Sequence, residues 1–229
     1  MLDVLTASLA IAVLSFISVE KVARPEETAS VFSELLEGIT YALNHKLLRQ
    51  VLLYFGISFF LITPAAFLTP LLVERSFGSD VWRLTANEMV WTTGSLIGGV
   101  FVSLHGEFKN KILTVAICLV AFGISFALLG VAGNFTIYLL IMGVAGLFMP
   151  VAATAQTVLI QENVEAAMMG RVFSLVQILT GAAMPVAILF FGPLADIVPI
   201  GAILLVTGLL LAVAGVLYQF TSKRAGLNL

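Results

Sequence analysis

The chain alternates between long apolar runs and short polar segments. A helix that crosses the hydrocarbon core of a bilayer needs about 20 residues, and seven runs approach or exceed that length. The predicted spans are Leu2–Val19, Gln50–Val73, Leu84–Leu104, Ile112–Gly130, Phe135–Ile160, Val172–Ala195 and Ile200–Phe220. The uncharged stretch from Ile112 to Gln161 is too long for one crossing, and the turn-forming residues of Gly130–Phe135 divide it in two. The runs are uniformly apolar, which argues against the alternating pattern of a membrane β-barrel.

Composition places the chain among integral membrane proteins. Only 24 of the 229 residues are charged and 60% are hydrophobic, whereas about a quarter of the residues of a soluble domain carry charge. The mean hydropathy is +1.11. A net charge of −2 without a basic cluster argues against nucleic-acid binding. We therefore predict an all-α membrane protein with the lipid bilayer as its main partner.

The distribution of basic residues predicts the orientation of the spans. Lysine and arginine concentrate in cytoplasmic connections, and nine of them fall on one side of the predicted spans against two on the other. The nine are Lys21, Arg24, Lys46, Arg49, Lys109, Lys111, Arg171, Lys223 and Arg224, and the two are Arg75 and Arg83. We therefore expect the protein in the plasma or inner membrane of the cell. Seven spans would then put its N-terminus outside and its C-terminus in the cytoplasm.

One cytoplasmic connection, residues 20–49, is much longer than the others. Within it, Val31, Leu35, Ile39 and Ala42 fall on one helical stripe, while Glu34 and Glu37 face away. This pattern predicts an amphipathic helix at the membrane surface. The expected organisation is a single span (1–19), this loop (20–49), a six-helix bundle (50–220) and a cytoplasmic tail (221–229).

Prolines and glycines occur inside several predicted spans. Pro64 and Pro70 lie in the second, Pro150 in the fifth, and Pro185 and Pro193 in the sixth. Such residues can break a helix where it lines a cavity or hinge in a transporter, although both types are common in membrane helices generally. Gly94 and Gly98, four residues apart in the third span, predict close helix packing.

A few polar and aromatic residues within the spans are candidates for function. Glu88 lies about 7 Å into its span, where an ionisable group is a candidate for proton coupling; the alternative is an interfacial carboxylate paired with Arg83 or Arg75. Gln156 and Gln177 should face other helices or a cavity, and Trp91 and Phe59 could line an aromatic pocket. Each of these four could equally serve packing.

The cytoplasmic turns contain the candidates for gating. Gly106, Asn110 and Lys111 lie in the tight turn "LHGEFKNK", and Arg171 begins the sixth span. We expect Arg171 either to pair with Glu162 and Glu165 or to act as an ordinary positive anchor. Neither a nucleophile–base motif nor a metal or phosphate-binding motif occurs in the sequence, so an enzyme, a metal site and a cofactor are not expected.

Three local patterns resemble the C-terminal half of a major facilitator superfamily transporter, in the drug-efflux branch that includes macrolide and enterobactin exporters. "GSLIGGVFVSLHGEFKNK" resembles the turn between helices eight and nine of that family. "GRVFSLVQ" is similar to the start of helix eleven, and "GPLAD" to its outer end. Glu107 and Phe108 depart from the more basic pattern common in this turn. The resemblance covers essentially the whole chain, and residues 1–19 would correspond to helix six.

The resemblance implies an ion- or proton-driven exporter of small amphipathic molecules, an antiporter in which substrate lies between two six-helix halves. Helices one to five have no counterpart here, so we expect a fragment of a longer transporter, with a separate first half or a second copy as partner. The alternative is a non-transporting membrane subunit or scaffold, in which the Gly94/Gly98 face would capture a partner.

Overall fold

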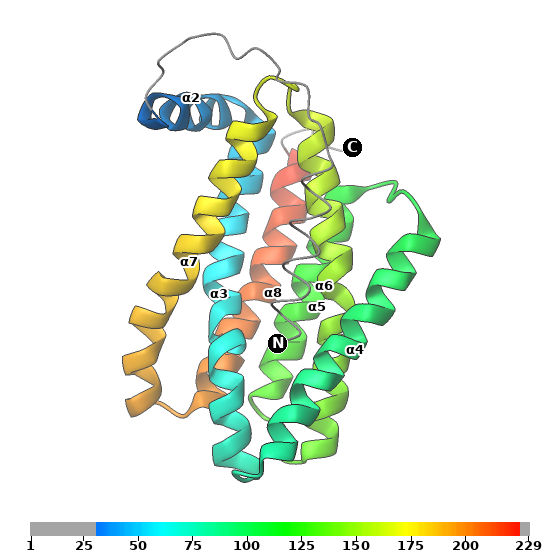
Figure 1. Ribbon diagram of the computed structural model, residues 1–229, viewed down its shortest axis with the longest axis vertical. Helices are drawn as coiled ribbons and strands as arrows, with labels where there is room; N and C mark the ends of the chain where they lie inside the picture. Colours follow the sequence, from blue (N-terminus) through cyan, green and yellow to red (C-terminus); the bar gives the residue numbers. More distant parts are fainter. Residues whose placement is uncertain (1–30, 225–229) are drawn as a thin grey trace, which may run out of the picture. The chain divides into compact units, whose positions relative to one another are not determined.

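The computed structural model describes residues 31–224, with side-chain positions from residue 36 onward, and these residues form helices and short turns without strands (Figure 1). The helices are α2 (Val31–Asn44), α3 (Lys46–Phe77), α4 (Val81–His105), α5 (Lys111–Leu129), α6 (Phe135–Asn163), α7 (Met169–Ile197) and α8 (Ile200–Arg224). The all-α prediction is confirmed for this part of the chain. The predicted first span, Leu2–Val19, lies outside the described residues.

Five of these helices are long and apolar enough to cross a membrane: α3, α5, α6, α7 and α8. Helix α4 has 25 residues but is less apolar than these five helices. Its polar residues, among them Asn87, Glu88, Thr92 and Thr93, lower its hydropathy. The chain is therefore a multi-pass helical membrane protein, while the count of seven spans stays a prediction.

The helices extend past the apolar runs at several of their ends. Helix α3 begins at Lys46 rather than Gln50 and ends at Phe77 rather than Val73. Charged side chains at the ends of membrane helices reach the interface with their head groups, so the helix continues beyond the apolar run. The turn expected near Gly130–Phe135 is confirmed, because α5 ends at Leu129 and α6 begins at Phe135.

The internal prolines do not interrupt the helices. Pro64 and Pro70 lie within α3, Pro150 within α6, and Pro185 and Pro193 within α7, each of which is one continuous helix. The helices therefore continue through these prolines, while a kink at any of them stays a prediction. Membrane helices tolerate proline where neighbouring helices and local adjustments satisfy the freed backbone groups.

Helix α5 packs against α8 and α6, α4 packs mainly against α6, and α3 packs against α7 and α8 (Figure 1). Helices α4 and α7 thus form two edges of the bundle, drawn on opposite sides in Figure 1. Their burial agrees with this position, since α4 buries only Asn87, Gly94 and Gly98. Two helices of the bundle consequently expose most of their surface in this chain.

Glycines allow the closest helix contacts. A Cβ atom on Gly94 would collide with the Gly143 carbonyl oxygen of α6, and one on Gly98 with the Leu147 carbonyl oxygen. Helices α5 and α8 make a similar approach, where a Cβ on Gly123 would collide with the backbone of α8. The predicted packing role of Gly94 and Gly98 is confirmed. The same contacts mean that α6 already occupies the face that the scaffold alternative would have used to capture a partner.

Candidate functional site

The turn between α4 and α5 has a well-defined backbone and capping structure. Gly106 ends α4 with a φ of 74°, a left-handed conformation that favours glycine. Asn110 caps the start of α5, where its side-chain Oδ1 accepts a hydrogen bond from the Leu113 amide at 2.8 Å. The Thr114 hydroxyl donates to the Asn110 carbonyl oxygen at 2.9 Å. The sequence-predicted turn residues therefore shape the turn itself.

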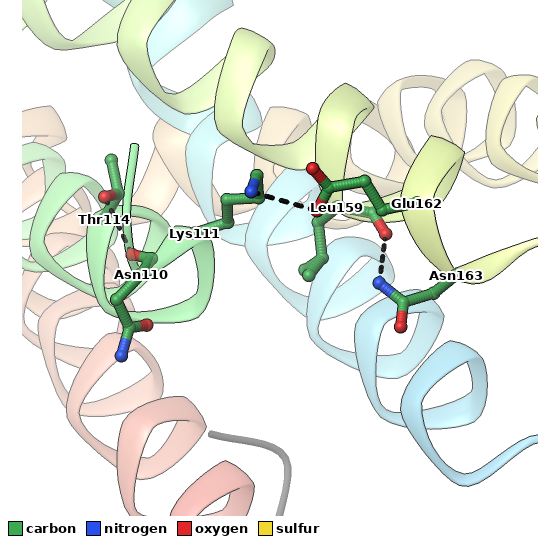
Figure 2. Close-up of polar contacts among 6 residues, drawn as sticks. All are labelled: Asn110, Lys111, Thr114, Leu159, Glu162 and Asn163. Atoms are coloured by element: carbon green, nitrogen blue, oxygen red, sulfur yellow. Dashed lines mark hydrogen bonds and ion pairs between the residues drawn. The ribbon is translucent and has the colours of Figure 1, made fainter. Parts of the chain in front are cut away.

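An ion pair connects this turn to the end of α6. Figure 2 shows Lys111 reaching toward Glu162, and its Nζ lies 2.9 Å from Oε2. The Lys111 side chain is only 13% exposed, whereas that of Glu162 is 45% exposed. Beside it, the Asn163 side chain donates to the Leu159 carbonyl oxygen at 2.8 Å. The start of α5 and the end of α6 are thereby held together by a half-buried charge pair.

A second ion pair involves Arg171, but with a different partner from those predicted. Its guanidinium lies 2.9 Å from Glu37 Oε1 of α2, and Gly38 packs close to the Arg171 backbone and Cβ. The predicted pairing with Glu162 and Glu165 is wrong, because Glu162 pairs with Lys111 and the α2 helix approaches α7 through Gly38. Arg171 therefore joins α2 to the start of α7.

Glu88 is exposed on α4, and its carboxylate accepts a hydrogen bond from the Asn87 side-chain amide at 3.1 Å. Neither predicted arginine pairs with it: Arg83 forms an ion pair with Asp80 at 3.3 Å, and Arg75 donates to the Ala195 carbonyl oxygen at 3.5 Å. Asn87 is 1% exposed, and its Oδ1 has no hydrogen-bond partner among the described residues. Glu88 thus forms no ion pair within the described residues, and the sequence analysis missed its hydrogen-bond donor, Asn87.

The four predicted substrate-binding residues come from four different helices, α6, α3, α7 and α4. Gln156 faces a small internal cavity of about 10 Å³ together with Ser58 and Tyr218. Phe59 is half-buried and stacks on Phe55. Their assignment to substrate stays a prediction.

Gln177 is exposed on α7, and Trp91 is half-buried on α4 where that helix approaches Gly146. Both helices form edges of the bundle. A shared pocket between Gln177 and Trp91 would therefore need another element to close it.

Helices α4 and α7 each carry an exposed stripe of polar and small residues that the sequence analysis did not identify. At 100° per residue, Thr85, Glu88, Thr92, Gly99 and Ser103 of α4 fall within a sector of about 60°, apart from the buried glycine face. Gly99 is half-buried, and the exposed Val81 at the first turn of α4 falls in the same sector. Large apolar residues occupy a third face of α4: Met89, Leu96, Val100 and Leu104.

The α7 stripe consists of Gly170, Ser174, Gln177 and Gly181, which are all exposed and also fall within about 60°. A Cβ atom on Gly170 or Gly181 would meet no atom within 4 Å among the described residues. Hydropathy averages over all faces of a helix, which is why neither stripe was visible before the buried faces were known.

A groove of about 860 Å³ opens between α2, α3 and α7. Its wall is largely apolar, with Ile39 and Leu43 from α2, Leu52 and Leu53 from α3, and Leu175 and Ile178 from α7. Lys46 and Arg49 line it at the first turn of α3. The sequence predicted α2 as a helix, but it gave no indication that α2 and α7 enclose this space.

The described residues hold no group of three or more histidine, cysteine, aspartate or glutamate side chains that could bind a metal ion. The site residues are instead amides, hydroxyls, one carboxylate and aromatic rings. Such groups can bind an amphipathic molecule by hydrogen bonds and apolar contact.

Comparison with known proteins identified macrolide efflux proteins as relatives. The chain is 27% identical to macrolide efflux protein A of Streptococcus pyogenes over 214 residues, which are 92% of this chain and 53% of that protein. It is 29% identical to macrolide efflux protein A of Enterococcus faecalis over 157 residues, 68% of this chain and 49% of that protein. No family model matches the chain.

The chain thus spans about half the length of the curated relatives that it matches. This fits the resemblance to the C-terminal half of a major facilitator superfamily transporter. The apolar helices support a membrane location for this chain.

Proposed function

We propose that this chain forms the C-terminal half of a secondary active exporter of small amphipathic molecules, with macrolide-like compounds as the first class to test. The similarity to macrolide efflux proteins over half their length supports this proposal. The observation that carries it is the pair of exposed polar stripes on α4 and α7. A second half would cover these stripes and share a substrate cavity with them.

The physical reason lies in the cost of polar groups in lipid. Ionisable and amide side chains within a membrane span normally face another helix or a water-filled cavity. Glu88 on α4 and Gln177 on α7 are exposed in this chain, although the apolar face of α4 offers a separate surface for lipid. We therefore assign the apolar face of α4 to lipid and both stripes to the interior of the complete transporter.

In this proposal the two halves rock about a central substrate, as in transporters built from repeated halves. Glu88 couples the movement to a proton in this proposal, because it is an ionisable side chain exposed within α4 rather than at its end. Gln177 and Trp91 contact substrate from this half, and Gln156 and Phe59 support them. The Lys111–Glu162 and Arg171–Glu37 pairs steady the cytoplasmic ends of the helices during the movement.

The proposal also includes seven spans, with the N-terminus outside and Lys46, Lys111, Arg171 and Arg224 on the cytoplasmic side. Gln50 near the start of α3 donates a hydrogen bond of 2.7 Å to Thr221 near the end of α8. This contact supports placing the start of α3 and the end of α8, which both carry basic residues, on the same side of the membrane. A bilayer orients such a basic end toward the cytoplasm.

The proposal is tested by macrolide efflux from cells that make this chain with or without the remaining half of a macrolide efflux relative. We expect no efflux from the chain alone and proton-dependent efflux when both halves are present. Glu88→Gln should abolish that efflux, whereas Glu107→Gln, a matched change in the exposed α4–α5 turn, should leave it intact.

Proton-coupled efflux by this chain alone would contradict the assignment as a half-transporter. If both halves assemble but Glu88→Gln and Gln177→Ala leave efflux unchanged, neither residue has the role proposed here. Assembly without any efflux would favour the non-transporting subunit instead.

A further inference from the structure

The groove between α2, α3 and α7 combines an apolar wall with a basic end. Lys46 is the first residue of α3, and Leu53 lies seven residues later, about 10 Å along the helix axis at 1.5 Å per residue. The groove therefore extends from a charged boundary into the apolar part of the helix. Leu175 and Ile178 of α7 continue the apolar wall on the opposite side.

The two cations at this end are available to a ligand. Lys46 and Arg49 are both exposed, and neither forms an ion pair within residues 36–224. The neighbouring Gln50 is already engaged, because its side-chain amide donates to the hydroxyls of Thr221 and Ser222 at 2.7 and 2.8 Å. The charges of Lys46 and Arg49 are thus the main polar feature of the groove.

Helix α2 positions this groove at the surface of the membrane. Ala42 is buried against the bundle, whereas Leu36 and Leu43 are 64% and 54% exposed. A helix that exposes large apolar residues next to basic ones is typical of an element lying in the membrane interface. Basic pockets between helices on the cytoplasmic side attract acidic lipid head groups.

We propose that the groove binds one acidic phospholipid from the cytoplasmic leaflet. The lipid phosphate lies between Lys46 and Arg49, and one acyl chain follows the apolar wall formed by Leu53 and Ile178. A soluble anion would leave the apolar wall unused, and an uncharged apolar molecule would leave both cations without a partner. The ligand that matches both features carries an anionic head and a hydrocarbon tail.

This inference is independent of export, although the choice of the cytoplasmic leaflet rests on the orientation proposed above. The groove lies within the described chain and involves none of the residues assigned above to substrate or proton coupling. Lipid binding can therefore be measured on the purified chain whether or not a second half is required for transport.

The test measures the apparent affinity of the full chain, purified in a neutral detergent, for phosphatidylglycerol. The readout is the thermal midpoint of labelling at Cys118, the single cysteine of the sequence and 1% exposed, because a ligand that binds the folded state raises this midpoint. Phosphatidylglycerol should raise it, whereas phosphatidylcholine and glycerol 3-phosphate at the same concentrations should not. Native mass spectrometry should show one retained phosphatidylglycerol.

Two matched pairs of substitutions test the basic end. Lys46→Gln with Arg49→Gln should weaken the apparent affinity about 30-fold, since each basic residue near an anionic surface contributes about 1 kcal/mol and 1.4 kcal/mol is tenfold. Lys223→Gln with Arg224→Gln removes the same charge from the exposed end of α8 and should change it less than about threefold. Equal effects of both pairs would overturn the site, because they would indicate diffuse attraction only.

A third substitution tests the apolar wall. Ile178→Trp fills the groove from a side chain that is 50% exposed, and it should abolish lipid retention while Lys46 and Arg49 stay in place. If this variant fails to fold, Leu53→Trp makes the same test from a side chain that is 61% exposed. Unchanged retention in the folded variant, or equal stabilisation by glycerol 3-phosphate, would overturn the proposal.

Discussion

The close contact between α4 and α6 gives a sharp prediction about stability. Gly98 and Gly99 are neighbours on α4, but only Gly98 faces α6. A Cβ on Gly98 would collide with the Leu147 carbonyl oxygen and lie 2.8 Å from Pro150 Cγ, whereas a Cβ on Gly99 would meet no atom within 4 Å among the described residues. Gly98→Ala therefore adds a methyl group where α6 leaves no space, whereas Gly99→Ala adds the same group where no described atom is in contact.

The expected difference follows from packing. Adding a methyl group where there is no space costs about 1–3 kcal/mol, because α6 must move away and the neighbouring contacts loosen. Alanine is favoured over glycine in a helix by about 1 kcal/mol, and this gain applies to both variants. In a chain of this size the packing cost corresponds to a shift in Tm of roughly 2–12 °C, so Gly98→Ala should have the lower Tm by that amount.

Labelling of Cys118 provides the assay. This thiol is buried on α5 and lines a hollow together with Ile97 of α4 and Leu147 of α6, so it becomes reactive when the α4–α6 contact loosens as well as when the bundle unfolds. Gly99→Ala should match or slightly exceed the Tm of the unchanged chain. Equal shifts in the two variants would refute the assignment of Gly98 to the α4–α6 contact and, with it, the packing order of the bundle.

Two further predictions concern the α4–α5 turn and the start of α7. Asn110→Ala removes the acceptor of the Leu113 amide and should destabilise the chain by about 1 kcal/mol, which lowers the Tm measured by Cys118 labelling. Asn110→Asp keeps an acceptor and should retain most of the stability. Identical Tm values for the two variants would argue against the cap. Arg171→Glu and Glu37→Arg should each lower the Tm, and the double variant should recover part of the loss, because the pair across 2.9 Å is then reversed rather than broken. A double-mutant cycle should give a coupling of up to about 1 kcal/mol for this partly exposed pair, and no coupling would show that the contact contributes nothing to stability.

Hydropathy was sufficient to locate the apolar segments of the described chain. The turn that divides the long uncharged stretch between α5 and α6 was also predicted, since glycine and asparagine mark it directly in the sequence. These features depend on residues close together in the chain. The ends of the helices were less accurate, because Lys46 and Phe77 continue α3 beyond its apolar run.

The internal prolines show the limit of a local rule. Proline removes one backbone hydrogen bond wherever it stands, so the sequence suggested breaks at Pro64 and Pro150. Whether a helix ends there depends on how its neighbours hold it, and the bundle keeps α3 and α6 continuous.

The candidate site required the tertiary structure for a related reason. The sequence identified Glu88, Gln177 and Arg171 as unusual, but the partner of Arg171 proved to be Glu37, more than a hundred residues earlier in the chain. The polar stripes on α4 and α7 also became visible only when the buried faces of these helices were known.

The sequence by itself determined the class of this protein, the approximate position of its helices and the concentration of lysine and arginine at one end of the predicted spans. These properties follow from the cost of placing each residue in lipid, which each segment carries largely alone. The structure decided which helices touch, which charges pair and where α2, α3 and α7 leave a groove. Those outcomes depend on the shapes of side chains distant in sequence, because packing and ion pairs need two surfaces and a single segment supplies only one.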